Sequence, residues 1–237
     1  MTTAGWCGDE TPDNYSVFSE LFDGTQADYV VVPDRNLIAK PASMSFATAA
    51  ALGTAWLTAY KMLFSKSRLR SGMTMLVQGA SGGVSTALIQ MGSAAGMTVW
   101  VTGRSAEKRA HAEALGAHQT FAPGEALPRR VDAVFETVGE PTWEHSLASL
   151  RRGGTMVLAG MTSGNDPAAN LARIFVEQIS IVGSVMGTLE EMRNLVDFVV
   201  TAGITPKVGL SLPLEDAIAG YRDMWADETK GKIVFTR

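Results

Sequence analysis

The feature that most constrains this chain is a regular alternation, between residues 74 and 187, of short apolar runs with longer helical patterns. Such alternation predicts an α/β fold with a doubly wound parallel sheet and helices on both faces, because parallel strands need long crossover connections. The runs are nearly continuous in apolar residues, as expected for strands buried on both sides. The expected strands are residues 75–79, 97–102, 131–135, 155–159 and 179–182. The expected helices are residues 82–95, 105–115, 143–150 and 170–177.

The flanks of this region follow a different pattern. Residues 28–33 predict a strand that ends at a proline, and residues 208–212 and 232–235 predict two more strands around a helix at 214–226. A length of 237 residues corresponds to about one and a half domains at about 150 residues each. The flanks are therefore rich in β structure but too short for an independent barrel.

Composition excludes several classes of protein. Hydrophobic residues make up 46% of the chain and charged residues 19%, which is typical of a globular protein. The net charge of −4, without any block of Lys or Arg, gives no support for binding nucleic acid or an anionic membrane surface. We see no secretory signal and no apolar run of about 18 residues, so the sequence favours a cytoplasmic protein. The single cysteine, Cys7, excludes an internal disulfide and fits a reducing compartment.

A glycine-rich segment at residues 79–85 lies directly between an expected strand and an expected helix. Without side chains at Gly79 and Gly82, the backbone can turn tightly and approach a pyrophosphate, which the N–H groups of the following helix then face. This context predicts dinucleotide binding, with a purely structural turn or another nucleotide-like ligand as alternatives. Ser85 stands where the usual fingerprint has its third glycine. The candidate residues of this segment are Gly79, Ala80, Ser81, Gly82, Gly83 and Val84.

The residues after the second expected strand indicate which dinucleotide is bound. Enzymes that use NAD usually place a carboxylate there, to accept hydrogen bonds from the ribose hydroxyls. Here the chain instead carries an arginine, a serine and a lysine, which suit a 2′-phosphate and favour NADP(H) over NAD(H). The alternative is that these cations are merely solvated side chains at the start of a helix. The candidate residues are Thr102, Gly103, Arg104, Ser105 and Lys108.

Together these segments resemble the medium-chain dehydrogenase/reductase superfamily, in its zinc-type alcohol dehydrogenase and quinone oxidoreductase branch. Further matches in the same order are residues 26–33, 49–60, 69–72, 115–117, 132–139, 152–154 and 231–234. The resemblance implies a partial GroES-like catalytic domain at residues 1–45, a Rossmann domain with a connecting helix at 46–205, and a return to the catalytic domain at 206–237. It also implies that the chain is N-terminally truncated relative to the family.

The resemblance also assigns roles to individual positions. Residues 81–84 would contact the pyrophosphate, and the strand between Ile179 and Ser184 would lie at the sheet edge and pair with a second subunit as a homodimer. The residues implied around the ribose and nicotinamide are Thr58, Thr137, Val138, Gly160, Met161, Ser184, Val185 and Met186. For the apolar members of this set, core packing is an equally good interpretation.

Zinc is not expected. The family position that often carries a ligand cysteine is Thr54, and a structural zinc loop needs four thiolates where this chain offers Cys7, with Glu10 and Asp13 nearby. The other residues of zinc-binding type are His111, His118 and His145, which lie on or beside expected surface helices and are interpreted as structural or solvated.

The function that the sequence predicts is an NADP(H)-dependent oxidoreductase that transfers hydride to or from a quinone, an enone or a small carbonyl or alcohol. Without zinc, the protein needs hydrogen-bond donors for the developing oxyanion. Tyr29, Thr54 and Tyr60 are the donors that we expect near the cleft, although each also suits a structural role. The alternative function is a dinucleotide-binding module that lacks its catalytic half and binds NADPH without turnover.

Overall fold

The computed structural model describes residues 23–237, so the predictions on Cys7, Glu10 and Asp13 lie outside the described residues. The chain divides into two compact units. The central unit is Thr58–Val185, and the flanking unit joins Met186–Arg237 to the residues up to Leu57. Each unit is described by itself.

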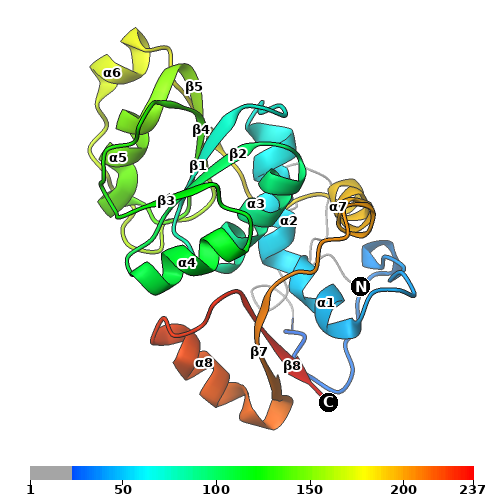
Figure 1. The fold of residues 1–237 in the computed structure, drawn as a ribbon. Coiled ribbons are helices and arrows are strands. Elements are labelled where there is room, and N and C mark those ends of the chain that lie inside the picture. Colours follow the sequence, from blue (N-terminus) through cyan, green and yellow to red (C-terminus); the bar gives the residue numbers. More distant parts are fainter. Residues whose placement is uncertain (1–22) are drawn as a thin grey trace. The chain divides into compact units, whose positions relative to one another are not determined.

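The central unit is built on a six-stranded parallel sheet with the strand order β3-β2-β1-β4-β5-β6 (Figure 1). This is the doubly wound sheet that the sequence predicts, because the chain moves outward in one direction from β1 and in the other from β4. The strands are β1 (Thr74–Gln78), β2 (Thr98–Thr102), β3 (Gln119–Phe121), β4 (Val131–Glu136), β5 (Leu150–Leu158) and β6 (Ser180–Gly183). The helices between them are α3 (Gly83–Ala94), α4 (Ala106–Ala114), α5 (Glu140–Ser149) and α6 (Leu171–Val176).

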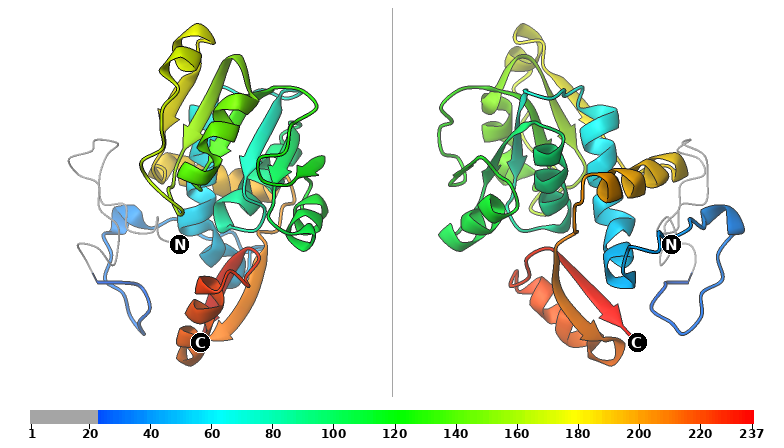
Figure 2. Two further views of the ribbon diagram at one scale, coloured as in Figure 1. Left: turned by 90° about the vertical axis from the view of Figure 1, so that its left-hand side faces the viewer. Right: turned by 45° about the vertical axis from the view of Figure 1, so that its right-hand side comes forward.

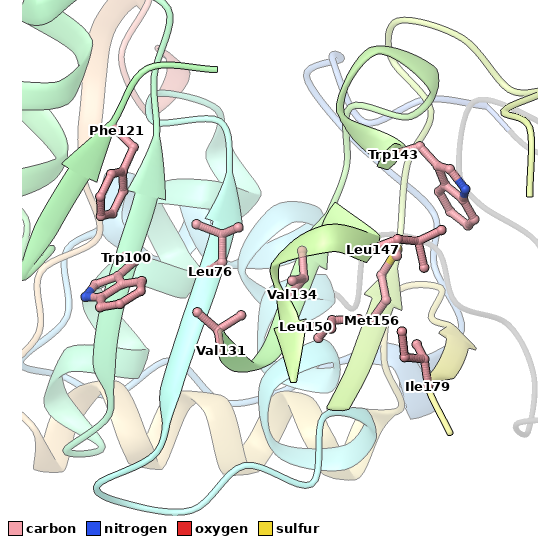
Figure 3. Close-up of a cluster of buried hydrophobic side chains, with 10 residues drawn as sticks. All are labelled: Leu76, Trp100, Phe121, Val131, Val134, Trp143, Leu147, Leu150, Met156 and Ile179. Atoms are coloured by element: carbon pink, nitrogen blue, oxygen red, sulfur yellow. The ribbon is translucent and has the colours of Figure 1, made fainter. Parts of the chain in front are cut away.

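Side-chain alternation along the strands places helices on both faces of the sheet. Gly92 of α3 sits so close to Met75 of β1 and Val99 of β2 that an added Cβ would lie 2.7 Å from the sulfur of Met75 and 3.2 Å from Val99. The next residue along β1, Leu76, points to the other face, where it joins a buried cluster with side chains of α5 (Figure 3). This cluster comprises Leu76, Trp100, Phe121, Val131, Val134, Trp143, Leu147, Leu150, Met156 and Ile179.

The flanking unit contains a two-stranded parallel sheet of β7 (Val208–Pro213) and β8 (Lys232–Thr236), joined by η5 (Leu214–Asp216) and α8 (Ala217–Trp225). α1 (Phe46–Ala51) packs against both strands (Figure 2). Its N-cap is Ser45, whose side chain accepts a hydrogen bond from the Thr48 N–H. The helical path continues through a π-helical segment, η3 (Leu52–Trp56), into α2 (Leu57–Tyr60) and a second π-helical segment, η4 (Lys61–Lys66), where the central unit has begun.

The structure corrects the prediction of a strand at residues 28–33, which form no regular structure up to the short η2 (Asp34–Asn36). The side chains of Tyr29 and Val31 are 93% and 97% exposed. A run of β-branched and aromatic residues forms a strand only when a neighbouring strand pairs with it and buries one face, and in the described residues none does so here. The structure also adds β3 and α7 (Leu189–Thr201), which are not among the elements predicted above.

The remaining expected strands and helices are confirmed, with ends that shift by a few residues. In the described part of the chain, no helix is both long enough and apolar enough to cross a membrane.

Candidate functional site

The carboxyl ends of the strands in the central unit meet at one edge of the sheet, and most of the predicted cofactor residues follow those ends. Gly79 comes directly after β1, Gly103 after β2, Thr137 after β4, and Ser184 after β6. In open α/β sheets this edge is where ligands bind, at the point where the direction of winding reverses between β1 and β4. The sheet therefore brings together predicted residues that lie up to 106 positions apart in the sequence, from Gly79 to Val185.

The turn after β1 has the geometry that close approach to an anion needs. Gly79 has a φ of +93°, a conformation that residues with a side chain rarely adopt, and its N–H donates to the Thr102 hydroxyl at 3.2 Å. Gly82 is the N-cap of α3 and has no side-chain oxygen to cap the helix. The backbone N–H groups of the first turn of α3 thus face the end of the sheet without a capping side chain, which favours an anionic ligand.

The turn after β2 lies against the turn after β1. A Cβ added at Gly103 would lie 3.0 Å from the Cβ of Ala80 and 2.9 Å from the Cγ of Arg109, so the two backbones approach each other as closely as glycine allows. Arg109 also donates to the Gly103 carbonyl at 2.7 Å. Ser105 caps α4, as predicted, by accepting a hydrogen bond from the Lys108 N–H at 3.2 Å. Arg104, between Gly103 and this cap, is exposed.

The turns after β4 and β5 are held together by backbone hydrogen bonds. The Ser163 N–H donates to the Val138 carbonyl at 2.8 Å, and the Ala159 N–H donates to the Glu136 carbonyl at 3.0 Å. Gly160 lies so near Thr137 that an added Cβ would stand 2.9 Å from the Thr137 carbonyl oxygen. The predicted residues after β4 and β5 therefore form one continuous structure, with Met161 63% exposed beside it.

Ser184, directly after β6, carries a buried polar group. Its hydroxyl oxygen is inaccessible to solvent and has no hydrogen-bond partner among the described residues, while its N–H donates to the Leu158 carbonyl at 2.8 Å. Buried hydroxyls in native proteins are nearly always hydrogen-bonded, so Ser184 stands out among the described residues as a buried polar group without a partner.

Behind the turns lies a buried polar network that the sequence analysis missed. Glu136, the last residue of β4, is fully buried and accepts hydrogen bonds from four donors. These are the N–H groups of Val138 (2.8 Å) and Gly139 (3.1 Å) and the hydroxyls of Thr142 (2.9 Å) and Ser146 (2.6 Å). These four donors match the hydrogen-bonding capacity of the two carboxylate oxygens.

The network continues from β4 to the ends of β1 and β2, and so to the glycine-rich turn. The amide nitrogen of Gln78 donates to the Ser146 hydroxyl at 2.9 Å and contacts Nδ1 of His145 at 3.0 Å. The Gln78 carbonyl oxygen accepts from the Thr102 hydroxyl at 2.6 Å, and that hydroxyl accepts from Gly79. A polar residue at the end of each of three apolar strands was the only sequence signal that pointed to this arrangement.

The predicted catalytic donors do not gather within one unit. Tyr29 lies on the exposed irregular segment and Thr54 is exposed in η3, both in the flanking unit. Tyr60 belongs to the central unit, where its ring packs at 4.8 Å between centroids on Phe64. Of the other predicted residues, Thr58 is buried in α2, and Met186 begins the flanking unit with a φ of +39°, uncommon for a residue with a side chain. A catalytic role for the three donors stays a prediction.

Two of the three histidines, His118 and His145, make hydrogen bonds to the backbone. Nδ1 of His118 accepts from the Val99 N–H at 3.1 Å, and Nε2 of His145 lies 2.9 Å from the Glu125 carbonyl. Among residues 23–237, no three His, Cys, Asp or Glu side chains gather so that they could hold a metal ion.

The fold and this edge define a Rossmann-type domain, the class of fold that binds dinucleotides where parallel strands end. The family described as "Zinc-binding dehydrogenase" matches residues 83–201, which is half of the chain. The chain therefore belongs to this family, within the medium-chain dehydrogenase/reductase superfamily that the sequence motifs resemble.

Known relatives agree with this assignment. A zinc-type alcohol dehydrogenase-like protein of Schizosaccharomyces pombe is 30% identical over 95% of this chain and 71% of its own length. The quinone oxidoreductase of Mus musculus is 28% identical over 89% of this chain and 69% of its own length. A solved NAD-dependent alcohol dehydrogenase superposes with a TM-score of 0.87 at 34% identity, covering 94% of this chain and 68% of that one. The chain is accordingly an oxidoreductase of the alcohol dehydrogenase and quinone oxidoreductase type.

Proposed function

We propose that the protein is an NADP(H)-dependent oxidoreductase that transfers hydride to or from a quinone, an enone or a small carbonyl or alcohol. The observation that carries the proposal is the cationic turn after β2. It combines Arg104, the Ser105 hydroxyl and Lys108, and Gly103 holds it against the glycine-rich turn. A dinucleotide whose pyrophosphate lies at the start of α3 directs its adenosine ribose toward the end of β2, where these groups suit a 2′-phosphate.

The residues present fit such a cofactor. Gly79 and Gly82 leave room for the pyrophosphate, and the Ser184 hydroxyl after β6 has no hydrogen-bond partner among residues 23–237. The turn that contains Thr137 and Val138, anchored on Glu136, would face the ribose and nicotinamide. When bound, the cofactor supplies the hydride at C4 of its nicotinamide ring, and the chain's own residues hold and orient it.

The preference for NADP(H) is tested by reversing the charge at Arg104. We expect Arg104→Asp to weaken NADPH binding by about tenfold to a hundredfold, the loss of one charged hydrogen bond plus repulsion, and to change NADH binding by less than about threefold. Arg130→Asp is the matched control, because it makes the same change of charge just before β4, at the opposite ends of the strands. Equal losses for NADPH and NADH in Arg104→Asp would show that no 2′-phosphate binds there.

The substrate class is proposed from the chemistry and from the relatives. The mouse relative is named a quinone oxidoreductase and the solved relative an NAD-dependent alcohol dehydrogenase. We expect NADPH oxidation, followed at the absorbance of the reduced cofactor, with at least one member of a panel of quinones, enones and small aldehydes. Tight NADPH binding without turnover on the whole panel would instead support a binding module that needs a further catalytic part.

We also propose that two copies of the chain pair through β6. This strand lies at the edge of the sheet and pairs only with β5 in the described residues. Ile181 of β6 is 38% exposed, and Phe175 of the neighbouring α6 is 72% exposed. An apolar edge strand with unpaired backbone groups favours association with a second strand, and a second copy of β6 offers a matching edge.

A further inference from the structure

We propose that Glu136 is a positioning residue that holds the turn after β1 and the turn after β4 in one fixed arrangement, through Ser146 and Gln78. We call this connection between the two turns the linkage, and it rests only on contacts within the central unit. Its effect on ligand binding rests on the proposed function, since a bound dinucleotide would contact both turns.

The hydrogen bonds of the network have a defined direction. The Glu125 carbonyl can only accept, so Nε2 of His145 carries the ring proton and Nδ1 is an acceptor. The two N–H bonds of the Gln78 amide then go to Nδ1 of His145 and to the Ser146 hydroxyl. The Ser146 hydroxyl, having accepted from Gln78, donates its own hydrogen to Glu136. Along this path from Gln78 through Ser146 to Glu136, each N–H or O–H hydrogen is donated to one acceptor.

The direction explains why the acceptor at position 136 must be a carboxylate. Glu136 terminates the path that comes from Gln78, and it also accepts from the Val138 and Gly139 N–H groups of its own turn. A glutamine there would present N–H groups on one side and leave one of these donors without an acceptor. In a fully buried network an unmatched donor costs more than the bond is worth in water.

Ser146 is the link between the two halves. Its hydroxyl is fully buried and bonds both Gln78 and Glu136. At the other end of the Gln78 side-chain amide, the Thr102 hydroxyl donates to the Gln78 carbonyl oxygen and accepts from the Gly79 N–H. Gly79 is the first residue of the glycine-rich turn. The pyrophosphate side and the nicotinamide side of the candidate site therefore share one set of hydrogen bonds. Such supporting hydrogen bonds hold the residues that would contact a ligand in position before the ligand binds.

The test compares Ser146→Ala with Ser149→Ala. Ser149 lies on the same helix and is also buried, but its hydroxyl donates to the His145 carbonyl and takes no part in the path between the turns. We measure amide hydrogen exchange at Val138 and Gly79 by NMR. We expect Ser146→Ala to raise exchange about tenfold at both amides and Ser149→Ala to leave both near the wild-type rate. Equal exchange in the two variants would overturn the proposal.

A third variant keeps the test decisive if Ser146→Ala does not fold. Thr142→Ala removes a donor to Glu136 without touching Gln78. Because Thr142 has no bond to Gln78, an effect at Gly79 would have to pass through Glu136 and Ser146. We expect faster exchange at both Val138 and Gly79, whereas a change at Val138 alone or at neither amide would contradict the linkage.

The exchange measurement separates failure of this proposal from failure of the proposed function. With NADPH as the probe, Ser146→Ala should raise the Kd about tenfold. Adenosine 2′,5′-bisphosphate lacks the nicotinamide half and would contact the turns after β1 and β2 but not the turn after β4, so its Kd should rise by less than that of NADPH. Equal losses for both probes would contradict a role that spans the two turns. Absence of binding to the wild-type chain would refute the proposed function, and the exchange rates would still decide the linkage.

Discussion

Replacing Gly79 by alanine tests whether the turn after β1 serves a ligand rather than the fold. Gly79 has a φ of +93°, and the nearest atom to an added Cβ is the Ser85 Oγ at 3.4 Å, so the methyl group itself meets ordinary contact. The cost is therefore the backbone strain of an alanine in a left-handed conformation, about 1–2 kcal/mol. For a chain of this size that corresponds to a Tm lower by about 2–8 °C, unless the turn relaxes to a negative φ.

Gly72 provides a matched control at the opposite end of β1. It has a φ of +86° and no atom within 4 Å of an added Cβ, so Gly72→Ala carries the same strain and no clash. We expect similar losses of Tm in the two variants by differential scanning fluorimetry. NADPH binding, measured by cofactor fluorescence, should weaken at least about tenfold in Gly79→Ala, because strain in this turn displaces the N–H groups that open α3. It should stay at the wild-type value in Gly72→Ala. Unchanged binding in Gly79→Ala, or an equal loss in both variants, would refute this reasoning.

Three further predictions concern other positions. Gly103→Ala should weaken NADPH binding by isothermal titration calorimetry, because its methyl group would force the turn after β2 away from Ala80; wild-type affinity would refute the close approach. Burial disfavours the charge of Asp132, but the hydrogen bonds from Arg151 (2.6 Å) and the Thr74 N–H (2.8 Å) and the charges of Arg151 and Arg129 outweigh it and lower its pKa below 3.8. Ionised Asp132 then stabilises the fold above pH 3.8 and loses that effect as the pH falls through its lower folded-state pKa. Asp132→Asn should therefore lower the free energy of unfolding in urea at pH 7 by up to about 1 kcal/mol for this partly exposed pair, and by progressively less under acid conditions; an equal loss at all pH values would contradict this assignment. Ile181→Lys should convert a dimer to a monomer in analytical ultracentrifugation, because it places a charge on the β6 edge, and an unchanged dimer would exclude that interface.

Much of the central unit could be predicted from the sequence, since its signals are local. The apolar runs that became β1, β2 and β4 are buried on both faces, and the glycine-rich turn and the Ser105 cap depend on residues next to one another. α7 was also predictable, because Thr188 and Glu191 form a capping box before an apolar helical pattern. α7 follows the last strand of the parallel sheet, so the alternation of strands and helices does not call for it.

What could not be predicted depends on residues far apart in the sequence. The Glu136 network joins Gln78 to Ser146 across 68 positions and Thr102 to Gln78 across 24. The sequence next to a buried glutamate at the end of an apolar strand does not indicate which distant residues will donate hydrogen bonds to it. The segment at residues 28–33 illustrates the opposite error, because its local β-propensity is high and the described residues provide no strand to pair with it.

The most direct test of the central claim is a titration of the wild-type chain with NADPH and with NADH, followed by the fluorescence of the reduced nicotinamide. The account predicts saturable binding with one site per chain, and an affinity for NADPH that exceeds that for NADH by about tenfold or more through Arg104 and its neighbours. Equal affinities would contradict the assignment of the 2′-phosphate, and no binding of either cofactor would contradict the dinucleotide site itself.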